Sequence, residues 1–170
     1  TSSDTLAKIF TDIKSYIGGS KDQWQVALLP FFGGWNNFDE NNYREIIKGL
    51  DFDGIEIFVA PAYKNTESML MTIKSCDLLI NMRYHASLIG MSYGIPTISI
   101  CNDLHPHYYN KVVALHKSFK SLGNIIYMSD FSVGQLNKKL RSLKLDTTAN
   151  INIAKSKFNK MKRYLNNLDI

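Results

Sequence analysis

The stretch from Cys76 to Ile100, CDLLINMRYHASLIGMSYGIPTISI, decides the fold. An apolar run is followed by a turn, a helical segment, the break Gly94-Ile95-Pro96 and a second apolar run. This order predicts a strand over residues 77–82, a helix over 85–93 and a strand over 96–101. A strand, a helix and a second strand in this order are typical of a parallel sheet.

The rest of the chain continues the same alternation. Further strands are predicted over residues 24–29, 54–60 and 124–128, and helices over residues 6–17, 43–50, 66–75, 108–122, 133–143 and 151–168. The strands are continuous apolar runs, which favours a sheet that is buried on both faces. We therefore predict an α/β fold, a three-layer Rossmann-like sandwich with a mostly parallel sheet of about five strands.

Length and composition indicate an ordinary globular domain. The chain has 170 residues, of which 45% are hydrophobic and 21% charged, so a single domain over residues 1–170 is expected. The net charge of +5 favours anionic partners. Five of the 20 basic residues lie in the last 16, which favours a solvated helix face over a nucleic-acid or membrane patch.

The two cysteines, Cys76 and Cys101, lie in or beside apolar runs. This placement predicts buried free thiols in a reducing cytoplasm. No apolar run approaches the roughly 18 residues that a membrane span needs. The sequence begins at Thr1 rather than at Met, so a fragment of a longer protein is expected.

Arg83 and His85 lie at the junction between the strand over 77–82 and the helix that follows it. Ligands of open α/β sheets bind at this carboxyl end of the strands. A guanidinium and an imidazole beside the N–H groups of a first helical turn suit a phosphate or carboxylate. The alternative is structural: Arg83 pairs with a nearby carboxylate and His85 is a satisfied structural histidine. The spacing alone leaves both open.

Other polar groups follow the remaining strands. Gly33 and Gly34 follow the first strand, but no GxGxxG motif accompanies them, so they indicate either a turn that needs positive φ or one wall of a ligand cleft. Asp103 and Lys111 follow the strand over 96–101, and Lys111 is a candidate second cation for the anion. His105 and His107 have no nearby third ligand, so a solvated loop is favoured over a metal site.

The same stretch resembles the polysaccharide pyruvyl transferase family. The family pattern is an aspartate, three apolar residues, then R-x-H-A and finally G-[IV]-P. It is met by Asp77, Leu78, Leu79, Ile80, Arg83, Tyr84, His85, Ala86, Gly94, Ile95 and Pro96. The clear motif covers about 25 residues, and looser agreement extends over most of the chain.

The resemblance implies an enzyme that transfers pyruvate from phosphoenolpyruvate to two hydroxyls of a sugar, as a ketal, in cell-surface polysaccharide synthesis. It implies a fold like the C-terminal domain of a two-domain, GT-B type glycosyltransferase, with a missing N-terminal domain without which this half is inactive. By the same resemblance His85 is the catalytic acid–base residue or a second group that binds the donor. Arg83, Tyr84, Lys111 and Asp103 are expected to contact substrate. No cofactor or metal is expected.

The expected partners are phosphoenolpyruvate and a sugar or lipid-linked glycan acceptor, in the cytoplasm with peripheral membrane association. A nucleic-acid partner is not expected. Two rival functions remain open. One is a GT-B glycosyltransferase domain that uses a nucleotide sugar, although the helix over 85–93 lacks a carboxylate to bind one. The other is a non-catalytic carbohydrate-binding domain.

Overall fold

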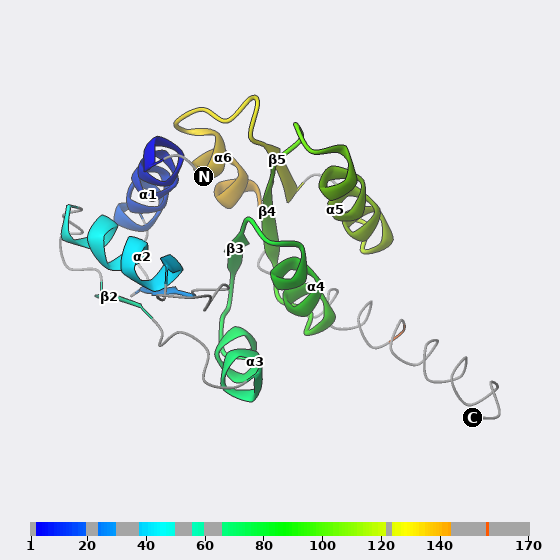
Figure 1. Ribbon diagram of the computed structural model, residues 1–170, viewed down its shortest axis with the longest axis horizontal. Helices are drawn as coiled ribbons and strands as arrows, with labels where there is room; N and C mark the ends of the chain where they lie inside the picture. The colour runs from blue at the N-terminus through cyan, green and yellow to red at the C-terminus, as the bar shows by residue number, and fades with distance from the viewer. Residues whose placement is uncertain are drawn as a thin grey trace. The chain divides into compact units, whose positions relative to one another are not determined.

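The computed structural model describes residues 3–19, 24–29, 38–49, 56–59, 66–121, 124–143 and 156. Helices alternate with parallel strands that form open sheets, which confirms the α/β, Rossmann-like class (Figure 1). The chain divides into two compact units. One comprises residues 1–69 and 131–142, and the other comprises residues 70–130 and 143–170. Each unit is described by itself.

The second unit is built around a parallel sheet of order β3-β4-β5. The strands are β3 (Leu79–Asn81), β4 (Thr97–Cys101) and β5 (Ile125–Tyr127). All five residues of the central strand β4 are buried, as its continuous apolar run predicts. Helices α4 (Tyr84–Ser92) and α5 (Pro106–Ser118) contact each other and lie on the same side of this sheet (Figure 1).

Helix α4 lies close against the sheet because it carries Gly90 on its buried side. A Cβ atom at Gly90 would lie 2.6 Å from Leu79 Cδ2 and 2.9 Å from Thr97 Oγ1. The helix ends before Gly94, whose φ of 78° is in the left-handed region that favours glycine. The Gly94-Ile95-Pro96 break therefore turns the chain from α4 into β4, as the sequence predicts.

The first unit contains helix α1 (Ser3–Gly18), strand β1 (Gln25–Leu28), helix α2 (Phe38–Lys48) and strand β2 (Glu56–Val59). Strands β1 and β2 pair in parallel, from Gln25 opposite Glu56 to Leu28 opposite Val59. Helix α6 (Gln135–Ser142) returns to this unit and packs against α1. Helix α3 (Thr66–Lys74) follows β2 in the sequence and precedes β3.

Two features differ from the sequence-based expectation, and a third cannot be compared with it. All five strands are present and parallel, but they pair as a two-stranded and a three-stranded set. Helix α2 begins at Phe38 rather than near residue 43. The helix expected over 151–168 lies, except for Ser156, outside the described residues. The single-domain organisation stays a prediction.

Candidate active site

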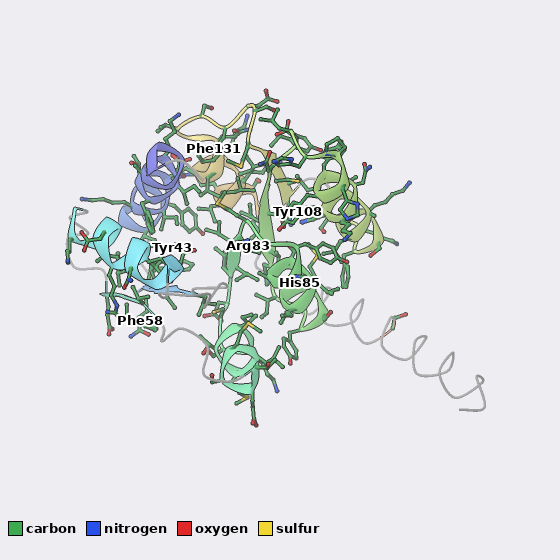
Figure 2. All side chains as sticks on the ribbon, in the orientation of Figure 1. Tyr43, Phe58, Arg83, His85, Tyr108 and Phe131 are labelled. Carbon is green, nitrogen blue, oxygen red and sulfur yellow. The ribbon has the colours of Figure 1, made fainter. Side chains whose placement is uncertain are left out.

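The turn between β3 and α4 presents Arg83 and His85 to solvent. Arg83 is the N-cap residue of α4, with an extended backbone, and its side chain does not cap the helix. His85 lies in the first turn of α4, and both side chains are exposed (Figure 2). His85 is thus not packed into the protein interior. Both residues are accessible to a ligand at the carboxyl end of β3.

Tyr108 holds this turn from helix α5. Its hydroxyl accepts a hydrogen bond from the backbone N–H of Tyr84, at 2.6 Å, and donates one to the carbonyl of Met82, at 3.1 Å. Met82 and Tyr84 are the residues directly before and after Arg83. The first-turn N–H groups of α4 were expected to be open to a ligand. This expectation is corrected, because the first of them is bonded to Tyr108.

Tyrosines surround the carboxyl ends of β4 and β5. Tyr84, Tyr108, Tyr109 and Tyr127 pack against a buried cluster formed by Cys101, Val112 and Ile125. The ring of Tyr84 also meets the imidazole of His85 edge-on, with centroids 5.5 Å apart. Tyr84, named as a substrate contact on the family resemblance, is thus half-buried and supports His85 from the side.

Asp103 joins the loops that follow β4 and β5. One carboxylate oxygen accepts the backbone N–H of Ser129, at 3.1 Å, and the other accepts the Ser129 hydroxyl. These hydrogen bonds, led by the one from the hydroxyl, lower the pKa of Asp103. The observed role of Asp103 is to fasten this edge of the sheet, and its contact with substrate stays a prediction.

The remaining sequence-predicted residues lie as follows. Lys111 is exposed on α5, one turn after Tyr108, and its part in anion binding stays a prediction. His105 precedes α5 and is exposed, whereas His107 is also exposed but lies in the first turn of α5, which begins at Pro106 rather than near residue 108. Gly33 and Gly34 lie outside the described residues. Among the residues that the structure describes, no cluster of His, Cys, Asp and Glu could hold a metal ion.

A chain of buried polar side chains runs beneath the site. His116 of α5 is fully buried, with Nε2 2.8 Å from Ser99 Oγ and Nδ1 3.0 Å from the carbonyl of Ser121. The hydroxyls of Ser99 and Ser87 lie 2.7 Å apart, and Ser87 donates to Asn81 at 2.8 Å. The chain thus links α5 through β4 to α4 and to the end of β3.

His116 makes the stability of the protein depend on pH. Burial lowers its pKa below the ordinary 6.5, and the hydrogen bond to Ser121 offsets this only in part. The unfolded chain therefore binds a proton more readily than the folded one, so the free energy of unfolding is expected to fall as pH drops below about 6.5. The slope from this one group cannot exceed about 1.4 kcal/mol per pH unit.

Urea unfolding between pH 7.5 and 5 measures this contribution. The His116→Gln variant is expected to show a flatter dependence on pH than the wild type. The exposed His107, replaced by glutamine, is the matched control and is expected to keep the wild-type slope. Equal slopes for wild type and His116→Gln would contradict the assignment.

Both cysteines are poorly suited to nucleophilic chemistry. Cys101 is buried and Cys76 half-buried, and both are free thiols, as the sequence predicts. Burial is the main cause that raises the pKa of each thiol, so the reactive thiolate is disfavoured.

The fold and this edge define a class of protein: an α/β, Rossmann-like chain with exposed cationic and titratable side chains at the carboxyl ends of parallel strands. A comparison with protein families matches residues 6–103 to polysaccharide pyruvyl transferase. The match covers more than half of the chain and includes Arg83, His85 and Asp103. The chain therefore belongs to the polysaccharide pyruvyl transferase family. Searches of curated proteins and of solved structures find no match.

The site also contains residues that the sequence argument did not single out. Tyr108 and the pair Ser87 and Ser99 carry no motif, and their partners lie 6 to 26 residues away in the sequence. His116 lies four residues after Val112, so its helical spacing places it on the same buried side of α5 as Val112 and Leu115.

Within the described part of the chain, none of the helices combines the length and apolar character that a membrane span requires.

Proposed function

We propose that the protein transfers the pyruvate unit of phosphoenolpyruvate to two hydroxyls of a sugar, forming a ketal, in the synthesis of a cell-surface polysaccharide. The observation that carries the proposal is the exposed pair Arg83 and His85 at the carboxyl end of β3, in a chain of the pyruvyl transferase family. The phosphate and carboxylate of this donor both suit a guanidinium, whose planar fork binds such groups through two hydrogen bonds.

The proposed chemistry begins with a proton. His85 donates it to the methylene carbon of the donor, which leaves an oxocarbenium centre at C2. A sugar hydroxyl adds to C2 and loses its proton, phosphate then leaves, and the second hydroxyl adds to C2 and loses its proton. General acid–base help of this kind is worth about 10²–10⁴-fold in rate. Arg83 stabilises the negative charge on the departing phosphate.

The proposal has further parts. The reaction takes place in the cytoplasm, without a bound cofactor or metal, on a sugar or lipid-linked glycan at the membrane surface. Lys111 and Asp103 act as further substrate contacts, and a second domain of GT-B type completes the cleft. In this arrangement Arg83 and His85 face the cleft from the C-terminal side.

Calorimetric titration of the full-length protein tests the donor. We expect phosphoenolpyruvate to bind and uridine diphosphate sugars to bind much more weakly. A preference for the nucleotide sugar would overturn the proposal in favour of a glycosyltransferase. Failure to bind either donor, together with binding of a glycan, would overturn it in favour of a carbohydrate-binding domain.

A further inference from the structure

We infer that Tyr108 is a positioning residue that fixes Arg83 for the donor, an inference that rests on the proposed function. The hydroxyl of Tyr108 bonds to the residue on each side of Arg83, at 2.6 Å to Tyr84 N and 3.1 Å to Met82 O. Arg83 therefore sits on a backbone segment whose two flanking peptide groups are held by one phenol. The phenol comes from α5, outside the segment matched to the family.

The hydroxyl, rather than the ring, performs this task. The ring of Tyr108 packs on the cluster formed by Cys101, Val112 and Ile125, and a phenylalanine would keep that packing. The hydroxyl instead satisfies an N–H group of the first turn of α4 and a carbonyl at the end of β3. The N–H of Tyr84 needs such a partner, because a helix leaves its first N–H groups unpaired.

The same contact changes which groups can hold the donor. With the N–H of Tyr84 bonded to Tyr108, a phosphate at this helix start cannot use the first amide of α4 without displacing the phenol. The guanidinium of Arg83 is then a donor group of this turn whose direction depends on a backbone that Tyr108 holds. A guanidinium gains its advantage over a point charge only when its fork is aligned with the ligand.

Tyr108→Phe is the test, and Tyr109→Phe is its matched control. Tyr109 lies next to Tyr108 on α5, but its ring contacts the ring of Tyr127 on β5, with ring centroids 5.8 Å apart. We expect Tyr108→Phe to weaken the binding of phosphoenolpyruvate about 3- to 10-fold, the worth of one hydrogen bond. Tyr109→Phe is expected to change it less than 2-fold.

Two further measurements separate positioning from stability. The melting temperatures of the two variants are expected to be similar, while their affinities for phosphoenolpyruvate differ. Amide hydrogen exchange at Tyr84 is expected to speed up in Tyr108→Phe and to stay unchanged in Tyr109→Phe. Equal losses of affinity in the two variants would mean that the hydroxyls are merely structural, and would overturn the inference.

The outcomes also distinguish this inference from the proposed function. If the wild type binds phosphoenolpyruvate and Tyr108→Phe binds it as tightly or more tightly, the positioning role fails while the proposed function stands. If the wild type does not bind this donor, the proposed function fails and the positioning role toward it falls as well. If amide exchange at Tyr84 is the same in wild type and Tyr108→Phe, the Tyr108 hydroxyl does not hold the turn around Arg83, and the inference is overturned.

Discussion

Arg83→Ala in the full-length protein is expected to weaken the binding of phosphoenolpyruvate about 10- to 100-fold. The side chain is exposed at the N-cap position of α4, so its loss removes donor groups for the ligand and leaves the buried core intact. Arg83→Lys keeps the positive charge and loses the planar fork. It is therefore expected to fall between wild type and alanine. Calorimetric titration at fixed salt measures both effects.

The control removes a positive charge from the same unit. Lys117 is exposed in the last turn of α5, whereas the candidate site lies at the start of that helix. Lys117→Ala is expected to keep the wild-type affinity within about 2-fold, because exposed charges at a distance are screened by salt. If Lys117→Ala weakens binding as much as Arg83→Ala, the effect is one of net charge and Arg83 has no special role.

The order of the helices and strands could be predicted because local sequence patterns, such as apolar runs and glycine breaks, indicate each element. The apolar run of β4 and the break at Gly94 lie next to one another in the sequence, and each needs only its own neighbours to form. The same holds for the placement of Arg83 and His85 at the start of α4. A motif of a few residues fixes their position relative to the strand end.

The contacts that support the site could not be predicted in this way. Tyr108 meets Met82 and Tyr84 only after α5 has folded back along the sheet, and nothing in the sequence around Tyr108 names those partners. The pairing of strands into β1-β2 and β3-β4-β5 is likewise a choice among apolar runs of similar character. Pairing between strands that are distant in the sequence depends on the whole fold. The spacing of neighbouring residues therefore does not indicate it.

Asp12 links two parts of the first unit that lie far apart in the sequence. Its carboxylate is buried in α1 and accepts backbone N–H groups of Gly134, at 2.6 Å, Leu136, at 3.0 Å, and Asn137, at 3.4 Å. These N–H groups belong to the start of α6, more than 120 residues further along the chain. A carboxylate at this position caps the helix and also meets the positive end of its dipole.

Asp12→Ala is expected to lower the free energy of unfolding by about 2–3 kcal/mol, because it leaves the buried N–H of Leu136 with no acceptor and removes the acceptor of two partly buried helix-start N–H groups. Ser15→Ala is the matched control. Ser15 lies one turn further on α1 and accepts one exposed hydrogen bond from Asn137, at 2.8 Å, so its loss is expected to cost under about 1 kcal/mol. Urea unfolding measures both variants.

The two losses should also differ in where they act. Amide exchange at Leu136 and Asn137 is expected to speed up in Asp12→Ala far more than in Ser15→Ala, since the first variant removes the acceptor of those amides. Buried Leu136 and Leu140 attach α6 through its apolar side, so the helix remains in place in the control. If the free energies of unfolding of Asp12→Ala and Ser15→Ala differ by less than about 0.5 kcal/mol, the apolar contacts alone hold α6 and the cap by Asp12 is dispensable.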